Sequence, residues 1–174
     1  AEAQHLLAGR KMWREWDWEG AEAAFRRAIE LNPNYPAVRS VYAQFLSIMK
    51  RPNEALEQSE RAMELDPFLD VIQHFHGTVL YMARRYDDAM AQFQNVLRTA
   101  PDHTGSLSKL SDVYHAKGMY DQEVATMRSL YTVTGFSEAE QALALGYAEG
   151  DYRAAAPRLA DTLVALRNVR HVSP

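Results

Sequence analysis

The sequence predicts an all-α fold, a solenoid of stacked antiparallel helix pairs with about ten helices in total. The segment AEAAFRRAIELNP at residues 21–33 returns as ALEQSERAMELDP at residues 55–67 and as AMAQFQNVLRTAP at residues 89–101. Repetition at a period of about 34 residues is typical of helix pairs that stack on their neighbours, because one pair alone cannot bury its apolar faces. A proline closes each copy and disfavours helix at the residue before it, so breaks are predicted near Pro33, Pro67 and Pro101.

The composition is that of a soluble globular protein and excludes several function classes. Apolar residues make up 47% and charged residues 24% of the 174 residues, and we expect one domain over residues 1–174. The formal charge of -4 and the lack of a lysine and arginine run argue against nucleic acid as a partner. No apolar stretch approaches the length of a membrane span, so no membrane insertion is expected.

The composition says less about the compartment. Cysteine is absent, which excludes disulfides and thiolate chemistry but leaves the location open, with the cytoplasm favoured. The first residue is not methionine, which suggests a fragment or a processed chain.

The first repeat, residues 2–35, begins with a predicted helix over residues 3–15, and a second helix starts after Asp17. The second helix carries an apolar stripe at helical spacing: Ala21, Ala24, Phe25, Ala28 and Ile29. Trp18 occupies the position that tyrosines fill in later repeats, so Trp16 and Trp18 are expected to pack between the helices. Trp13 stays open between packing and ligand stacking.

The second repeat covers residues 36–69 and departs from the pattern once. Asn53 is predicted to cap its second helix, since an asparagine side chain accepts well from the first backbone amides of a helix. Ser59 stands where the neighbouring repeats have Phe25 and Phe93, which predicts weaker packing at that position.

The later repeats become less regular toward the C-terminus. The third, residues 70–103, matches the pattern most closely and is expected to form the stable centre. The fourth, residues 104–137, replaces a small residue by Glu123 and the closing proline by Gly135. An atypical fifth repeat over residues 138–171 is predicted to be shorter, as expected for a terminal unit.

Two details of the fifth repeat can be tested against a structure. Ser137 and Glu140 have the spacing of a capping box and are predicted to start its first helix. Pro157 falls in its second helix, where it must either kink the helix or lie in the first turn.

The sequence contains no catalytic motif. It lacks a glycine-rich phosphate loop, a serine elbow, a paired-histidine zinc motif and an acidic calcium loop, so neither an enzyme nor a cofactor is expected. Asp112 and His115, near His74 from the preceding pair, are the one candidate metal site. Because no further ligand run accompanies them, a solvated polar groove explains these residues better, and no metal is expected.

The strict register of the repeats resembles the tetratricopeptide repeat over nearly the whole chain. The resemblance implies a right-handed superhelix in which the first helices of each pair line a concave groove for a peptide. Carried over position by position, it assigns a set of residues to that groove face: Ala3, Leu6, Arg10, Trp13, Ala37, Ser40, Gln44, Ser47, Val71, His74, Thr78, Tyr81, Gly105, Ser108, Asp112 and His115.

Two finer comparisons follow from the same resemblance. Family members that clamp an acidic C-terminal tail carry asparagine where this chain has Arg10, Gln44, Thr78 and Asp112, so such a clamp is not expected. The opening WDWEGAEAAFRRAIELNPNYPAV also resembles repeat regions attached to bacterial signalling proteins, such as receptor-type kinases and winged-helix regulators.

The leading functional interpretation is a noncatalytic scaffold that binds a protein or peptide in its groove. The predicted partner-binding residues are Arg10, Trp13, Gln44, His74, Thr78, Tyr81, Asp112 and His115. The alternative is a small-ligand-sensing module of a bacterial signalling protein that uses Trp13, His74, Tyr81 and His115. Second-helix residues such as Arg27 and Glu57 are expected to contribute almost nothing to binding.

The N-terminal end is a predicted site of self-association. Leu6, Leu7 and Trp13 lack an upstream repeat that would cover them. Uncovered apolar side chains of this kind tend to find a partner.

Overall fold

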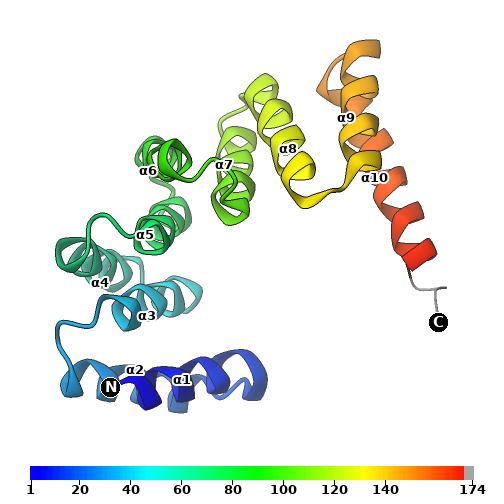
Figure 1. The fold of residues 1–174 in the computed structure, drawn as a ribbon. Helices are drawn as coiled ribbons and strands as arrows, with labels where there is room; N and C mark the ends of the chain where they lie inside the picture. The colour runs from blue at the N-terminus through cyan, green and yellow to red at the C-terminus, as the bar shows by residue number, and fades with distance from the viewer. Residues whose placement is uncertain (171–174) are drawn as a thin grey trace. The chain divides into compact units, whose positions relative to one another are not determined.

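A computed structural model describes the backbone of residues 1–170 and the side chains of residues 1–167. Residues 1–170 form ten α-helices and one short π-helical segment, and contain no strand. Figure 1 shows the helices in chain order. The prediction of an all-α fold with about ten helices is therefore confirmed. None of the described helices combines the length and the apolar character that a membrane span requires.

The helices follow the predicted period. The bounds are α1 Glu2–Arg10, which continues as the π-helical segment η1 Lys11–Glu15, then α2 Trp18–Leu31, α3 Pro36–Ile48, α4 Pro52–Leu65, α5 Asp70–Met82, α6 Tyr86–Thr99, α7 Thr104–Ala116, α8 Tyr120–Thr134, α9 Ser137–Glu149 and α10 Tyr152–Arg170. Helices α2, α4 and α6 each end just before one of the three closing prolines, which confirms the predicted breaks.

The chain divides into two compact units. Unit 1 is Ala1–Thr99 and contains α1 to α6, the first three repeats. Unit 2 is Ala100–Pro174 and contains α7 to α10. The description as one domain stays a prediction, and the last residue of the predicted fifth repeat, residue 171, lies outside the described residues.

An aromatic cluster forms the core between the first two repeats of unit 1. The ring of Phe25 lies 5.4 Å from that of Tyr42 and 5.6 Å from that of Phe45, measured between centroids. Trp18 packs 6.3 Å from Phe45, as predicted. Trp16 contacts the edge of Trp18 but remains 65% exposed, so the prediction that it packs between the helices is wrong.

The same core position in the next repeat is polar. Ser59 and His76 occupy, one repeat later, the positions of Phe25 and Tyr42, and the Ser59 hydroxyl lies 3.0 Å from Nδ1 of His76. Both side chains gain a partner in a partly buried place, and burial lowers the pKa of His76. The predicted weakness at Ser59 is therefore offset by a residue of the following helix.

Unit 2 has a smaller core of its own. One cluster of buried apolar side chains in it contains Val124, Ala139, Leu143, Ala155 and Leu159. Helices α9 and α10 approach closely at Gly146, where a Cβ would lie 2.6 Å from the Cα of Ala155, so a residue without a side chain is required there. Pro157 lies inside α10, beyond its first turn, which rules out the first-turn alternative.

Both predicted helix caps are wrong. Helix α4 begins at Pro52 with Arg51 in the capping position, because proline lacks an N–H and fits the first helical residue better than Asn53 fits a cap. Helix α9 begins at Ser137 itself, with Phe136 in the capping position and no side-chain cap. The Ser137 hydroxyl bonds to Glu138, and Glu140 accepts from Arg128 instead.

The turns inside the first four helix pairs each contain a left-handed residue at the same position of the repeat. Trp16, Lys50, Arg84 and Gly118 have φ of 55°, 58°, 61° and 70°. After three of them the next amide donates to a carbonyl five residues back at 2.9 Å, which closes the helix: Arg51 to Leu46, Arg85 to Leu80 and Met119 to Tyr114. The first turn differs because η1 lengthens it, and the amide of Asp17 donates to the carbonyl of Lys11.

We expect an Arg84→Gly substitution to raise the free energy of unfolding by up to about 1 kcal/mol. A left-handed conformation is costly for a residue with a Cβ, and glycine avoids that cost. The reciprocal change, Gly118→Ala, should lower it by about the same amount. Urea unfolding of both variants measures this, and a less stable Arg84→Gly protein would contradict the role assigned to this position.

Candidate partner-binding surface

The surface of unit 1 formed by α1, α3 and α5, here called the first-helix face, carries two hollows. The first, here called the His5 hollow, has a volume of about 220 Å³. Its walls come from all three first helices and are mostly apolar: His5, Ala37, Ser40, Val41, Val71, Ile72 and Phe75. Three of these, Ala37, Ser40 and Val71, belong to the predicted groove face.

The second hollow of the first-helix face, here called the Lys50 hollow, also has a volume of about 220 Å³. It lies where α3 and α5 end and is lined by Ser47, Lys50, Pro52, Met82 and Ala83. Both hollows therefore lie along the same pair of helices, α3 and α5.

Three of the predicted site residues in unit 1 reach the surface in different ways. Arg10 is exposed but bonded to Glu15, with 2.6 Å between Nε and the carboxylate oxygen. Trp13 is 53% exposed. Tyr81 is half-buried, and its ring lies 5.8 Å from that of Tyr86.

The remaining predicted residues of unit 1 are more enclosed. Gln44 is half-buried. His74 is half-buried too, with its ring 5.8 Å from that of Phe93. Thr78 is only 5% exposed, and its hydroxyl donates to the carbonyl of His74 at 3.0 Å, so it has little to offer a ligand.

The two predicted site residues of unit 2 have partners within that unit. Asp112 accepts from Lys109 at 2.7 Å. His115 is exposed, and its Nδ1 lies 3.1 Å from the buried carboxylate of Glu123. Tyr152 donates to the same carboxylate at 3.0 Å, and burial followed by this bond raises the pKa of Tyr152 to about 12.

This polar cluster explains why Glu123 departs from the repeat pattern. Other repeats have a small side chain at that position, whereas Glu123 pairs with His115 and Tyr152. Among the described residues, no group of three or more histidine, aspartate or glutamate side chains could hold a metal ion. The cluster therefore links α7, α8 and α10 and offers no ligand set for a metal.

Self-association through the N-terminal end stays a prediction. Leu6 is 66% exposed, and Trp13 of the adjoining π-helical segment is exposed as well. Leu7, in contrast, packs against the core of unit 1. Two of the three side chains named for this contact are thus on the surface.

A third hollow, of about 390 Å³, lies between the second helices α2 and α4, and Tyr42 and Leu46 of α3 complete its wall. It is lined by Arg26, Ile29, Glu30, Tyr42, Leu46, Glu54, Glu57 and Gln58. Its charged groups largely neutralise one another or their neighbours: Arg26 pairs with Glu22, Glu30 with Arg27, and Glu54 with Arg51.

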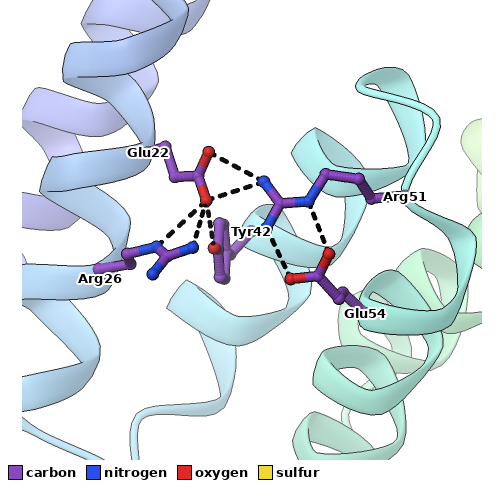
Figure 2. Close-up of polar contacts among 5 residues, drawn as sticks. All are labelled: Glu22, Arg26, Tyr42, Arg51 and Glu54. Atoms are coloured by element: carbon purple, nitrogen blue, oxygen red, sulfur yellow. Dashed lines mark hydrogen bonds and ion pairs between the residues drawn. The ribbon is translucent and has the colours of Figure 1, made fainter.

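Figure 2 shows the network that joins the first two repeats beside this hollow. The carboxylate of Glu22 accepts from the Tyr42 hydroxyl at 3.0 Å, from Arg26 at 2.7 Å and from Arg51 at 2.8 Å. Arg51 also donates to both oxygens of Glu54, at 2.7 and 2.6 Å. Arg51 thus connects a residue of α2 with one of α4.

The charge of Glu22 is stabilised by these bonds. Burial alone would raise the pKa of Glu22, but the hydrogen bonds from Arg51, Arg26 and Tyr42 together outweigh it and lower the pKa. The Glu22 side chain is 23% exposed, so water screens these contacts only in part. The arrangement stabilises the stack and occupies the carboxylate that a ligand would otherwise meet.

Sequence reasoning missed four lining residues of the His5 hollow: His5, Val41, Ile72 and Phe75. Val41 and Phe75 occupy the same position of successive repeats on α3 and α5. An apolar residue therefore recurs there, and this recurrence could have identified both residues although the resemblance does not assign that position to the groove face. His5 carried no such signal, because the equivalent positions of the next two repeats hold Arg39 and Gln73.

Comparison with known proteins identifies the fold. No protein-family model and no curated protein sequence matches the chain. MamA from Desulfovibrio magneticus RS-1 shares 16% identity over 96% of this chain and 95% of its own, with a TM-score of 0.72. PilF from Pseudomonas aeruginosa shares 19% identity over 94% and 75%, with a TM-score of 0.77. A thermophilic TPR protein from Thermus thermophilus shares 19% identity over 94% and 90%, with a TM-score of 0.72.

These likenesses concern the fold alone, since the identities are only 16% and 19%. They confirm the tetratricopeptide-repeat architecture. None of them tests the resemblance to repeat regions of bacterial signalling proteins, which stays a prediction.

Proposed function

From the tetratricopeptide-repeat fold of this chain, we propose that the protein is a noncatalytic scaffold that binds a peptide segment of a partner protein on the first-helix face of unit 1. A protein-interaction scaffold is the role that the fold suggests. The proposal adds the surface and the form of the partner.

The observation that carries the proposal is the pair of hollows on α3 and α5. Peptide-binding sites are concave and mostly apolar, with a few polar groups that orient the ligand. The His5 hollow has apolar walls from three successive first helices, and Tyr81 stands on α5 with its ring half-buried. Tyrosines are among the residues that most often concentrate binding energy.

The hollow between α2 and α4 is less suited to a peptide than the hollows of the first-helix face. Most of its lining is charged or amide-bearing, and three of its charged side chains already have partners of opposite sign. A ligand there would have to compete with ion pairs that are formed in its absence, whereas the apolar walls of the His5 hollow would gain from being covered.

The test is a selection from a display library of random peptides against the purified chain, followed by titration of the strongest binder. Truncating an anchor residue typically costs about 2 kcal/mol, so Tyr81→Ala should weaken binding about 30-fold. His74→Ala is expected to weaken it less, because His74 is already packed beside Phe93.

Arg27→Ala is the matched control, since Arg27 is exposed on α2 and pairs with Glu30 on the same helix. Each variant is first checked for an unchanged melting temperature. Equal affinity in Tyr81→Ala, His74→Ala and Arg27→Ala would place the binding surface elsewhere and overturn the proposal.

A further inference from the structure

Two uncommitted polar groups lie at the two hollows of the first-helix face. The first is Nδ1 of His5, which is buried and has no hydrogen-bond partner among the described residues. A buried nitrogen without a partner is unfavourable, and a ligand that supplies one removes that penalty. The His5 side chain forms part of the wall of the His5 hollow, so a ligand there can supply the missing hydrogen bond if the ring turns its buried Nδ1 toward the hollow.

Lys50 is the second uncommitted group. No ion pair involves its ammonium among the described residues, although it lines the hollow between the ends of α3 and α5. Helices α3 and α5 carry one carboxylate, Asp70, to which the Thr99 hydroxyl donates at 3.1 Å. The acidic residues of unit 1 are concentrated on the second helices instead, as in α4 with Glu54, Glu57, Glu60 and Glu64.

The charge at the Lys50 hollow is therefore complementary to an acidic ligand, whereas Glu2 of α1 acts on His5 at the other hollow. Asp70 stands at the first residue of α5, whereas the Lys50 hollow lies at the end of that helix, so the two charges are separated by the helix length. A carboxylate beside Lys50 would meet an ammonium without an ion-pair partner among the described residues. A basic ligand would meet the like charge of Lys50.

The facing edges of the two hollows lie close together on α3. Ser40 lines the first and Ser47 the second, and both stand on α3. At the rise of an α-helix their positions are about 10 Å apart along its axis. An extended peptide covers the same distance in about three residues.

We propose that the His5 hollow holds an aliphatic or aromatic side chain of the partner and that Lys50 pairs with an aspartate or glutamate three residues away on the same extended segment. This inference rests on the proposed function and adds the chemistry of the partner. The bound segment then lies along α3 and α5.

The state of His5 agrees with this arrangement. Burial lowers the pKa of His5, although Glu2 acts in the opposite direction. The ring is therefore neutral at pH 7, and one of its nitrogens can accept from a backbone amide of the ligand.

The experiment uses two display libraries against the full chain. Both fix an apolar residue, and one library has aspartate or glutamate three positions later while the other has lysine there. The acidic library should be enriched at least ten-fold over the lysine library at low salt. Equal enrichment, or no enrichment of either, would overturn the inference.

Charge reversal provides the sharper test. Lys50→Glu should invert the preference toward the lysine library, and Arg27→Glu, a matched reversal on α2, should leave it unchanged. His5→Phe keeps an aromatic ring without the nitrogen and should weaken a selected acidic peptide about five-fold. An unaltered preference in a folded Lys50→Glu protein would contradict the role of Lys50.

The outcomes separate this inference from the proposed function. If randomly selected peptides bind the first-helix face but show no acidic residue at this spacing, the proposed function stands and the inference fails. If they bind through the second helices, both fail.

Discussion

A Phe45→Ala substitution is expected to lower the free energy of unfolding of unit 1 by about 3–5 kcal/mol, the usual cost of removing a buried phenylalanine ring. Phe45 is fully buried and lies against Trp18, Phe25 and Tyr42, so the cavity would have walls from both of the first two repeats. The loss should appear in urea unfolding, followed by the fluorescence of the tryptophans.

Phe68→Ala is the matched control, because Phe68 is 87% exposed in the turn before α5. Exposed positions of this kind change stability by less than about 0.5 kcal/mol. Equal losses in the two variants would contradict the placement of the core between the first two repeats.

Glu22→Ala is expected to cost about 2 kcal/mol, because a charged partner left in a partly buried place is unfavourable. The substitution takes the acceptor away from Tyr42, Arg26 and Arg51 at once. Glu30→Ala, which removes an exposed pair with Arg27, should have almost no effect. Equal losses of unfolding free energy in Glu22→Ala and Glu30→Ala would show that the hydrogen-bond network around Glu22 does not stabilise the stacked repeats.

The pH dependence of the Glu22 effect has a defined sign. The pKa of Glu22 is lower in the folded chain than its ordinary value of 4.5, so the unfolded chain binds the proton more readily. The stabilisation that the Glu22 carboxylate gives the folded chain is therefore complete above pH about 4.5. It is lost as the pH falls through the lower pKa that Glu22 has in the folded chain. The difference in unfolding free energy between wild type and Glu22→Ala should be full at pH 7 and shrink in acid.

The repeat period and its breaks could be predicted from sequence because they depend on local rules. Proline stops each second helix, and small and aromatic residues recur at fixed positions, so Pro33, Pro67 and Pro101 are enough to place the helix pairs. The predicted caps at Asn53 and Ser137 are wrong because adjacent residues compete for each helix start, and the proline at position 52 decides the first.

Contacts between repeats could not be predicted one column at a time. Ser59 is polar at a repeat position that is otherwise apolar. Its hydrogen-bonding partner His76 lies on the next helix and is identified only by the packing of the helices. Glu123 likewise replaces a small residue but pairs with His115 and Tyr152 from two other helices. Both pairings depend on how the helices pack, which sequence spacing within one helix does not specify.

The site was predicted only in outline. Ala37, Ser40 and Val71 were assigned to one face and do line one hollow. Thr78 shared their side of the repeat but lines neither hollow. Trp16 is exposed at a left-handed turn position where packing was expected. Burial of a single side chain depends on its neighbours in three dimensions, so the repeat register alone could not separate these cases.

The most direct test of the central claim is a methyl NMR titration of the chain with a peptide selected in the display experiment. The claim that the first-helix face of unit 1 binds the partner predicts shifts of the methyl signals of Val41, Val71 and Met82. The signals of Ile29 and Leu31, on the second helix α2, should stay in place. Shifts of Ile29 and Leu31 with Val41, Val71 and Met82 unmoved would contradict it.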